Sequence, residues 1–575
     1  MELQGLAARS RTLALLAALC ALAAILVNAG PAHGASVIKT ATAASTEPVL
    51  VTETNRPPAG YRLTADRVEQ IAAANPRIRA ELRRHPRAIP YEYTKGPGMW
   101  QVSWFSAGRH QVELAQVYVS DARGRVTEAW TGFQVAWSMA RGYPGAFGRN
   151  VNSLYVWLPM CAVFLAPFFP WRRRPSLLHL DLLVLLGFSV SLALFNHGQI
   201  GLSVPLAYPF LIYLLARMLL LAFGRGRPRS PLRLVVPVSW LAIAVVFLVG
   251  FRIGLNVTNS NVIDVGYAGV IGANKLLHGQ HLYGHWPKDN AEGDTYGPVN
   301  YYAYVPARAI FGWSGTWDSL PAAHAAAILF DLLTLLGLFV LGRRIRGPTL
   351  GIVLAYTWAA YPFSLWALSS NTNDSLVGLL IVATLLVLGS PAGRGVFGAL
   401  AGLTKFAPLA LAPLWLRGPG SAPPRRRAVI VYVVSFAVTL VVAMLPVLLE
   451  GGLHVFWRDT IVYQASRITP FSVWGLWGGL GLEQHLVEGA AVALALIVAV
   501  VPRQRGLVEI AALAGAVVIA VQLGAGYWLY SYVVWFFPVV AVALFGVYPA
   551  RADERVTELA PGLVRWRSPA LARSL

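Results

Sequence analysis

Long apolar runs alternate with short, basic loops along the chain from Leu13 to Tyr548. The runs are roughly 17 to 25 residues long, and a helix of that length crosses a hydrocarbon layer of about 30 Å. The pattern predicts an all-α polytopic membrane protein with about twelve transmembrane helices. The first predicted span lies within residues 1–35, and the others lie at residues 153–170, 178–196, 203–223, 231–252, 320–342, 348–367, 373–389, 428–449, 485–501, 507–523 and 527–548.

The loop arginines predict how these spans are oriented. Arg9 and Arg11 precede the first apolar run, so the positive-inside rule places the N-terminus in the cytoplasm. Residues 29–35 are small enough to form a signal-peptidase site, so residues 1–35 are either a cleaved signal peptide or a retained membrane anchor. Both alternatives leave residues 36–150 outside the cytoplasm. Later arginine-rich loops and the tail at residues 549–575 then fall on the cytoplasmic side; the loops contain Arg172, Arg173, Arg174, Arg225, Arg227, Arg229, Arg233, Arg343, Arg344, Arg346, Arg503 and Arg505.

Residues 395–416 interrupt this alternation. If they crossed the membrane fully, the loop with Arg417 and Arg425 would face outward, against the charge rule. We therefore expect a re-entrant pair of half-helices that turns near Lys405 and Pro408, because broken backbone is tolerated at membrane depth where protein or a cavity satisfies it. An intramembrane lysine is a functional hypothesis by default. Entering from the cytoplasmic side, Lys405 either reaches a buried lipid phosphate or fills a cavity.

Composition excludes several classes of protein. The chain is 56% hydrophobic with mean hydropathy +0.56, and its 13% charged residues fall well below the share in soluble proteins, which is about 25%. The net charge of +21 is spread over the loops, so nucleic acid is not an expected partner. Both cysteines, Cys20 and Cys161, lie in apolar runs, which supports neither a disulfide framework nor a thiol metal site.

The predicted extracytoplasmic domain, residues 36–150, has a different pattern. Residues 64–84 show helical spacing, with Thr64 as the cap, and residues 99–105 and 112–120 alternate as strands before a turn at residues 121–124. This small α+β arrangement, with its W-x-V strand and D-x-x-G-x-V turn, resembles the extracytoplasmic PepSY-type modules. The resemblance offers no catalytic constellation, so we expect a docking or regulatory cap, with an enzymatic role as the alternative.

The longest loop between spans, residues 253–318, holds most of the candidate chemistry. Asp264, Tyr267, Lys275 and His278 are spaced to share one face of a helix, which predicts a helix at the membrane surface with a polar stripe. A second external loop, residues 450–484, brings Arg458 and Arg467 to the same side of the membrane. The further polar and aromatic candidates in the first loop are His281, Tyr283, Asp294 and Tyr296.

The sequence resembles GT-C-fold glycosyltransferases, and among them the polyprenol-phosphate-mannose-using branch called family 87. The resemblance rests on Asp264 shortly after a span, G-x-x-L-Y at residues 279–283 and Y-x-P at residues 296–298, together with residues 371–380, 402–414 and 467–476. It covers residues 231–548, which leaves residues 151–230 as accessory helices. Gly297 stands where the family commonly has a second proline, and no acidic neighbour accompanies Asp264.

The resemblance implies transfer of a hexose, such as mannose, or a pentose from a polyprenyl-phosphate carrier, with inversion at the anomeric carbon. The acceptor is a glycan, lipid or protein of the cell envelope, and the enzyme is a multi-pass protein of the plasma membrane. Asp264 is the candidate base, a role that typically contributes 10² to 10⁴-fold, although an aspartate here also suits a helix cap. Arg467 is the first candidate for the donor phosphate and Arg458 the second, although either arginine also suits an ion pair with Asp459 or a lipid headgroup.

The remaining candidates have weaker assignments. His278, His281 and Tyr283 are candidates for the sugar pocket, with an interfacial structural role as the alternative for each histidine, and Tyr267, Asp294, Tyr296 and Lys405 complete the expected substrate-binding set. The histidine spacing matches no closed zinc site, so we expect no cofactor and no divalent metal.

Two other classes of function compete. Twelve spans with a re-entrant segment also suit a secondary transporter, although such proteins often show two similar halves and midplane charges, and no repeat of the two halves is evident. A nonenzymatic membrane scaffold or sensor built around residues 36–150 is the other alternative.

Overall fold

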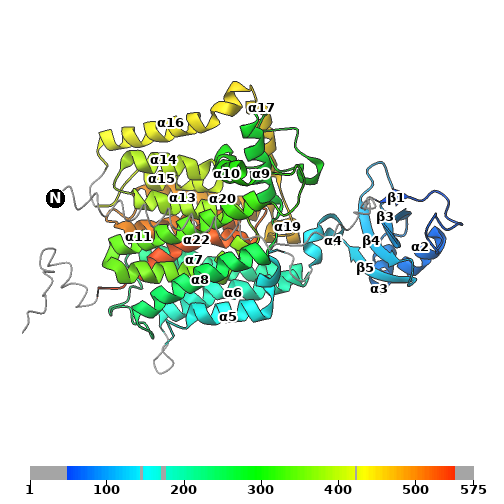
Figure 1. Ribbon diagram of the computed structural model, residues 1–575, viewed down its shortest axis with the longest axis horizontal. Helices are drawn as coiled ribbons and strands as arrows, with labels where there is room; N and C mark the ends of the chain where they lie inside the picture. Colours follow the sequence, from blue (N-terminus) through cyan, green and yellow to red (C-terminus); the bar gives the residue numbers. More distant parts are fainter. Residues whose placement is uncertain (1–47, 143–146, 170–175, 421–423, 551–575) are drawn as a thin grey trace, which may run out of the picture. The chain divides into compact units, whose positions relative to one another are not determined.

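The computed structural model describes residues 48–142, 147–169, 176–420 and 424–550, and these form two compact units that divide at Arg141 (Figure 1). The first predicted apolar run and nearly all of the tail at residues 549–575 lie outside the described residues. Each unit has its own core.

The first unit is a five-stranded antiparallel sheet with the strand order β1-β2-β3-β4-β5. Tryptophans and valines alternate inward along β3 and β4, where Trp100, Val102 and Val117 are fully buried. Trp100 Nε1 donates to Asp121 Oδ1 at 3.0 Å, which ties the predicted turn to the core. The elements are β1 (Val49–Leu50), α2 (Ala65–Ala73), α3 (Pro76–Arg84), β2 (Ile89–Thr94), β3 (Met99–Phe105), β4 (Glu113–Ser120), β5 (Arg125–Thr131), α4 (Phe133–Ala136) and the 3-10 helix η1 (Ser138–Arg141).

The helical segment predicted at residues 64–84 is two helices. Thr64 caps α2 as expected, but Asn75 caps a new helix, α3, whose first residue is Pro76. Proline has no N–H to donate and is favoured at the first position of a helix, so it ends α2 and begins α3. The two predicted strands are present as β3 and β4.

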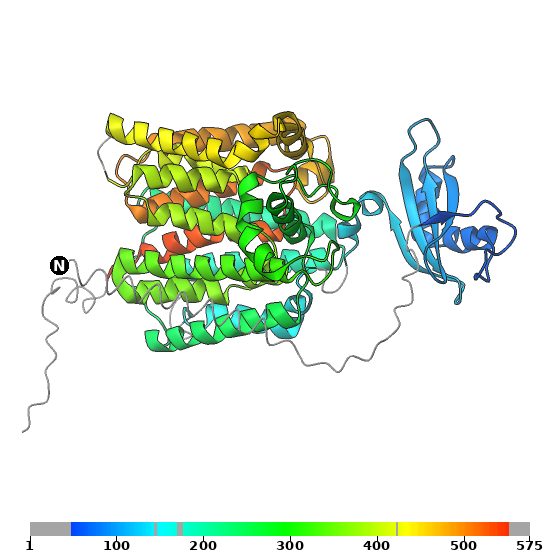
Figure 2. The ribbon, with the colours of Figure 1, turned by 45° about the horizontal axis from the view of Figure 1, so that its top comes forward.

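The second unit is helical, and its long helices run alongside one another in both ribbon views (Figures 1 and 2). Its first elements are η2 (Arg149–Asn152), α5 (Leu154–Leu165), α6 (Leu177–Asn196), α7 (Ile200–Ala222), α8 (Val238–Thr258), α9 (Asp264–Leu277), η3 (Lys288–Asn290), α10 (Pro298–Phe311), α11 (Pro321–Ala360), α12 (Pro362–Ser369) and α13 (Asp374–Leu386). The remaining elements are α14 (Pro391–Gly402), η4 (Ala407–Leu411), α15 (Ala412–Trp415), α16 (Arg426–Leu449), α17 (Leu453–Phe456), the π-helix η5 (Trp457–Val462), α18 (Tyr463–Ser466), α19 (Val473–Trp477), α20 (Gly481–Val500), α21 (Leu507–Gly524), η6 (Tyr530–Tyr532) and α22 (Val533–Gly546).

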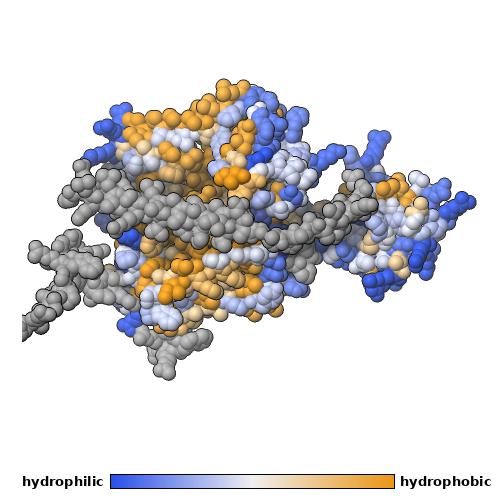
Figure 3. Space-filling view, viewed as in Figure 1, coloured by the Kyte–Doolittle hydropathy of each residue, from blue (hydrophilic) through white to orange (hydrophobic). Residues whose placement is uncertain are grey.

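Within the described residues, seven helices are long and apolar enough to cross a membrane: α6, α7, α8, α11, α16, α20 and α21. Helices α8, α16 and α20 leave most of their apolar surface uncovered by protein, and Phe247 is 72% exposed. Hydrophobic residues cover the visible sides of the long helices, and hydrophilic residues gather near their ends (Figure 3). An exposed apolar surface of this extent is typical of lipid contact. The predicted number of twelve spans is not confirmed, because α5, α13 and the segment at residues 530–546 are shorter apolar helices.

Helix α11 contains two helices joined at a sharp reversal. Arg346 and Gly347 have non-helical backbone angles, and Gly347 has a φ of +79°, which glycine adopts without steric cost. A Cβ on Gly342 would lie 2.6 Å from the Cα of Gly351, so the chain folds back on itself there. The two halves overlap the spans predicted at residues 320–342 and 348–367.

The segment predicted to be re-entrant leaves one end of the helical unit and returns to it. Arg394 Nε, at the start of α14, donates to the carbonyl of Trp415 at 2.8 Å, while Lys405 lies at the turn between α14 and η4. Arginine side chains at this end also bond to the carbonyls of Leu386, Arg503 and Tyr548. We call this end of the unit, where the basic loops gather, the basic end.

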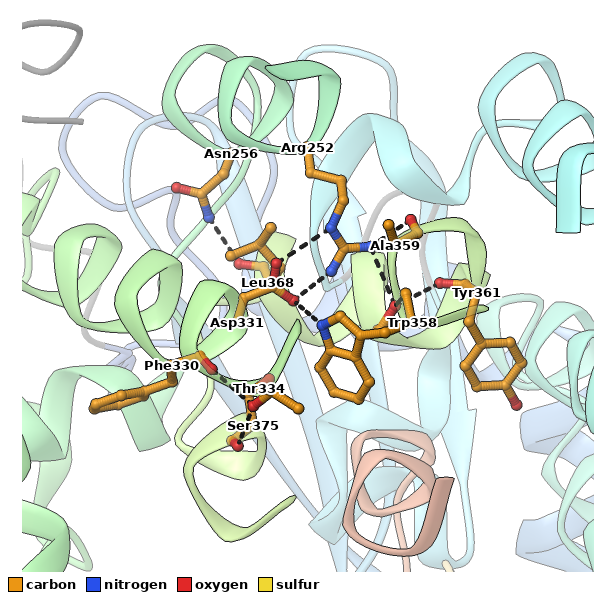
Figure 4. Close-up of polar contacts among 11 residues, drawn as sticks. Arg252, Asn256, Phe330, Asp331, Thr334, Trp358, Ala359, Tyr361, Leu368 and Ser375 are labelled. Carbon is orange, nitrogen blue, oxygen red and sulfur yellow. Dashed lines mark hydrogen bonds and ion pairs between the residues drawn. The ribbon is translucent and has the colours of Figure 1, made fainter. Parts of the chain in front are cut away.

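A buried ion pair joins α8 to α11 (Figure 4). The Arg252 guanidinium bonds to both carboxylate oxygens of Asp331, to the carbonyl of Ala359 at 3.0 Å and to Ser364 Oγ at 3.1 Å. Trp358 Nε1 also donates to Asp331 at 2.9 Å. Because both charges are bonded on several sides, the pair fixes α8 against α11 and the start of α12.

Candidate functional site

Two loops at the end opposite the basic end bring two aspartates together. The backbone N–H of Asn261 donates to the carbonyl of Ser369 at 3.2 Å, and that of Ile263 donates to the carbonyl of Ser370 at 3.3 Å. Each loop then leads directly into a helix whose first residue is an aspartate, Asp264 in α9 and Asp374 in α13. The paired loops therefore hold the two helix starts side by side.

Asn371 fixes this pairing. Its φ is +50°, a left-handed conformation that asparagine tolerates better than most residues. Its side chain accepts from Asn256 Nδ2 at 2.8 Å and donates to Ser260 Oγ and to the carbonyl of Asn261, both at 3.0 Å. Gly266 completes the close approach, because a Cβ there would lie 2.2 Å from the carbonyl oxygen of Asn371.

Asp374 is neutralised inside the protein by Lys405. The Nζ of Lys405 donates to Asp374 Oδ1 at 2.6 Å, and Trp535 Nε1 donates to the same oxygen at 2.7 Å. The three side chains come from three separate segments: α13, the turn after α14, and α22. The rings of Tyr296, Tyr532 and Trp535 surround the ammonium group, with their centroids 5.0 to 5.4 Å from Nζ.

Gly297 brings the first external loop against the Lys405 turn. Its backbone N–H donates to the carbonyl of Thr404 at 3.3 Å, and a Cβ at this position would lie 1.9 Å from the carbonyl oxygen of Leu403. A proline at residue 297 would lose that hydrogen bond and would clash with the turn. The contact gives a physical reason for glycine at residue 297.

Arg467 joins the same group of residues from the second external loop. Its guanidinium carbon lies 3.8 Å from the ring centroid of Tyr527 and 5.5 Å from that of Tyr463. The Nε of Arg467 is buried without a hydrogen-bond partner among the described residues. A buried, unpaired guanidinium nitrogen is costly, so Arg467 is suited to receive an anion.

Asp264 lies within range of both cations. Burial raises the pKa of its carboxyl above the ordinary value of 3.8, while the backbone N–H of Val265 and the charges of Arg467 and Lys405 oppose that rise. The side chain is nevertheless exposed. Exposure decides whether another molecule can touch the carboxylate. The amount of protein around the carboxylate decides how well water solvates its charge, so an exposed Asp264 can still have a raised pKa. We call this group of residues the Asp264 site: Asp264, Tyr296, Asp374, Lys405, Arg467, Tyr527, Tyr532 and Trp535.

Three predicted site residues support the fold around the first external loop instead. Tyr267 is buried and donates to Asp289 Oδ2 at 3.2 Å. Tyr283 donates to the carbonyl of Tyr296 at 2.8 Å, and Asp294 accepts from the backbone N–H of Gly284 at 2.8 Å. The last two bonds hold the loop that presents Tyr296.

Three other predicted residues lie on exposed surface away from the Asp264 site. His278 bonds to the carbonyl of Asn274 at 2.8 Å, and His281 lies 3.5 Å from Glu450. Arg458 is exposed and bonds to Asp459. Of the predicted set, the Asp264 site therefore contains Asp264, Tyr296, Lys405 and Arg467; the substrate contacts of the others stay predictions.

The predicted polar stripe on the helix of Asp264 is wrong. Tyr267 and Lys275 are buried, because Gly269 and Gly272 allow Tyr304 and Tyr301 of α10 to pack directly on α9. A Cβ on Gly272 would lie 2.1 Å from the Tyr301 ring. Helix α9 is thus packed within the protein.

From the sequence alone, Asp374 opens a predicted span, where a helix cap explains it as well as substrate binding does, and Tyr527, Tyr532 and Trp535 are not singled out. A signal for Asp374 was present, because it is the only acidic residue between Leu332 and Leu449 and Lys405 needs a counterion. The aromatic residues gave no such signal, since Tyr and Trp are common at membrane interfaces.

Among the described residues, no group of three or more His, Cys, Asp or Glu side chains has the geometry to hold a metal ion. No protein-family model matches the chain, and no curated protein matches it significantly.

Proposed function

We propose that this protein is a membrane glycosyltransferase that moves a hexose, such as mannose, or a pentose from a polyprenyl-phosphate carrier to an envelope glycan, lipid or protein. The observation that carries the proposal is the Asp264 site, in which an accessible carboxylate lies among two cations and several aromatic rings. A base and a cation are the two requirements of glycosyl transfer from a phosphate.

In the proposed reaction, Asp264 takes the proton from the acceptor hydroxyl as its oxygen attacks the anomeric carbon. The bond between that carbon and the phosphate oxygen breaks on the opposite face, and polyprenyl phosphate leaves with the bonding electrons. Inversion follows from this single displacement. The raised pKa of Asp264 favours this role, because a stronger base removes a hydroxyl proton more readily.

Arg467 and Lys405 are the proposed phosphate contacts. The unpaired Nε of Arg467 offers one donor, and the guanidinium presents its others in a planar fork that matches phosphate oxygens. Lys405 adds a second positive charge that Asp374 orients. Preorganised cations of this kind stabilise the charge that grows on the leaving phosphate.

The wider assignments belong to the same proposal. We infer a GT-C-like core of the family 87 type, about twelve spans and a location in the plasma membrane with the Asp264 site outside the cytoplasm. The gathering of arginines at the opposite, basic end favours that orientation. The first unit is proposed to be a PepSY-like cap that docks or regulates.

The decisive experiment compares envelope glycans and glycolipids by mass spectrometry in a deletion strain complemented with wild type or Asp264→Asn. Glu483→Gln is a matched control, because Glu483 is exposed at the start of α20. We expect a sugar-bearing species to return with wild type and the control but not with Asp264→Asn at equal membrane levels. If Asp264→Asn restores the sugar-bearing species, Asp264 is not the catalytic base, and the scaffold or transporter function is favoured.

The transporter is the second candidate function, because the α14–η4 turn places a buried charge pair within the helical unit. Transport predicts that radiolabelled substrate accumulates in proteoliposomes without a covalent product. Glycosyl transfer predicts a new glycosidic bond, with polyprenyl phosphate released in equal amount.

A further inference from the structure

Beside the Asp264 site lies a compact aromatic cluster that the proposed chemistry does not use. Trp317 packs on Tyr267 with ring centroids 4.9 Å apart, and Trp313 packs on the same tyrosine at 6.0 Å. Both tryptophans belong to the loop between α10 and α11, and Trp317 is 41% exposed. We call Tyr267, Trp313 and Trp317 the aromatic platform.

The platform is held rigidly. Trp313 Nε1 donates to the carbonyl of Thr316 at 3.0 Å, and Trp317 Nε1 donates to the carbonyl of Val262 at 3.1 Å. The hydrogen bond from Tyr267 to Asp289 fixes the tyrosine ring. Burial, together with the Asp289 carboxylate, raises the pKa of Tyr267 to about 12, so the hydroxyl keeps its proton. Binding to rings that are already fixed costs little conformational entropy.

The same contacts connect the platform to the candidate base. Val262, whose carbonyl accepts the hydrogen bond from Trp317, lies two residues before Asp264. Tyr267 lies about one helical turn after Asp264 in α9. Asn290, next to Asp289, donates through Nδ2 to the carbonyl of Asp264 at 3.0 Å. The exposed ring of Trp317 and the exposed carboxylate of Asp289 therefore flank the start of α9.

We propose that the aromatic platform is the acceptor subsite and that the acceptor is a glycan. Sugars present apolar C–H faces that stack on flat aromatic rings and hydroxyl groups that donate to carboxylates. Trp317 supplies the ring and Asp289 the hydrogen-bond acceptor. This inference rests on the proposed glycosyl transfer and adds the class of the acceptor, excluding a lipid or an unglycosylated protein.

The alternative is that both tryptophans are membrane-interface anchors. An anchoring indole typically directs its N–H toward water or headgroups. Here both N–H groups bond to backbone carbonyls within the protein, and the rings pack on a tyrosine of the helix that begins with Asp264. These contacts favour a binding surface over an anchor.

The test uses the full-length protein in lipid nanodiscs, with a mannose tetrasaccharide and an arabinose tetrasaccharide as probes. Binding is measured by calorimetry and transfer by the acceptor KM, with polyprenyl-phosphate mannose and polyprenyl-phosphate arabinose as donors. The variants are Trp317→Ala and the milder Trp317→Phe. Trp457→Ala is the matched control, because Trp457 is 56% exposed in the second external loop.

We expect Trp317→Ala to weaken binding of one tetrasaccharide and to raise the acceptor KM by about tenfold or more, with the donor KM unchanged. Trp317→Phe retains a ring and should stay within about threefold of wild type, as should Trp457→Ala. Trp317→Ala could also lower the unfolding temperature. In that case the three proteins are compared: an acceptor KM that falls from Trp317→Ala to Trp317→Phe to wild type still indicates stacking on the ring.

Three results would overturn the inference: wild type binds neither tetrasaccharide, Trp317→Ala binds as wild type does, or Trp317→Ala and Trp457→Ala weaken binding equally. A failure of the proposed function looks different. In that case wild type binds the tetrasaccharide through Trp317 but forms no glycosidic bond with either donor, and the platform belongs to a glycan-binding protein.

Discussion

Lys405 and Asp374 form a 2.6 Å ion pair across 31 residues of chain, and the pair lies beside the accessible carboxylate of Asp264. Neither residue is paired with a neighbour in sequence; the turn after α14 and the start of α13 bring them together. Lys405 either contacts a substrate anion as well as Asp374 or only neutralises Asp374 inside the protein, and these two roles of Lys405 predict different effects of substitution.

Removing one partner of this pair should destabilise the protein, because a buried charge is left uncompensated. Lys405→Met or Asp374→Asn should each cost about 3 to 5 kcal/mol of unfolding free energy. The double variant Lys405→Met/Asp374→Asn should recover most of that loss, as measured by thermal unfolding in detergent. If Lys405 contacts the donor phosphate, the double variant stays inactive although folded; wild-type activity in it would assign Lys405 a purely structural role.

The two arginines of the second external loop should differ in importance. Arg467→Gln removes the guanidinium with the unpaired, buried Nε and should lower kcat/KM by about 10² or more, because a charged donor to the leaving phosphate is lost. Arg467→Lys should recover little, since lysine lacks the planar fork. Arg458→Gln should be close to wild type, because Arg458 is exposed and bonded to Asp459. Equal losses at both positions would indicate a general effect of positive charge.

Catalysis should depend on pH through Asp264. A base acts when deprotonated, so kcat/KM should rise with pH through the pKa of Asp264 and fall about tenfold for each pH unit below it. Because burial raises that pKa, the midpoint should lie above the ordinary aspartate value of 3.8. The measurement is kcat/KM between pH 3.5 and 8 in nanodiscs, with separate proof that the protein stays folded at each pH. A flat profile across this range would exclude Asp264 as the base.

The Arg252–Asp331 pair tests the transporter alternative. Charges within a membrane often mark an ion pathway, yet this pair is bonded on all sides and joins α8 to α11. The double variant Arg252→Met/Asp331→Leu should therefore retain glycosyl transfer and lose no more than about 2 kcal/mol, whereas Arg252→Met alone should lose about 3 to 5 kcal/mol. Loss of a proton- or ion-coupled uptake signal in the folded double variant would instead support transport.

Sequence patterns predicted the helical membrane class and the turn near Lys405 because both depend on local properties. Apolar length sets the spans, and the arginines that follow residues 395–416 favour a re-entrant segment over a full crossing. The length of the spans was less predictable: α13 has 13 residues where a span of residues 373–389 was expected.

The site was predictable only in part, because it depends on packing between distant segments. Asp264 and Arg467 were found through motifs, but nothing local connects Asp374 to Lys405 or Tyr527 to Arg467. His278 was predicted from its helical spacing to Asp264, and His281 follows it in the same loop. Helix α9 runs from Asp264 to Leu277, so both histidines lie beyond its far end, and both are exposed. The buried position of α9 depends on Gly269 and Gly272 receiving tyrosine rings from α10, which helical periodicity alone does not reveal.

The left-handed backbone at Asn371 has a consequence for ligand design. Ser369 and Ser370 accept backbone hydrogen bonds from the loop before Asp264, and the Asn371 side chain bonds to the same loop. These contacts set the spacing between the starts of α9 and α13. Lys405 bonds to Asp374 at the start of α13, so a rigid inhibitor of the proposed transferase, with a cation for Asp264 and an anion for Lys405, can be matched to one fixed spacing. Resistance by substitution at Asn371 would displace both helix starts together, so the inhibitor and the natural substrate would lose affinity in the same step.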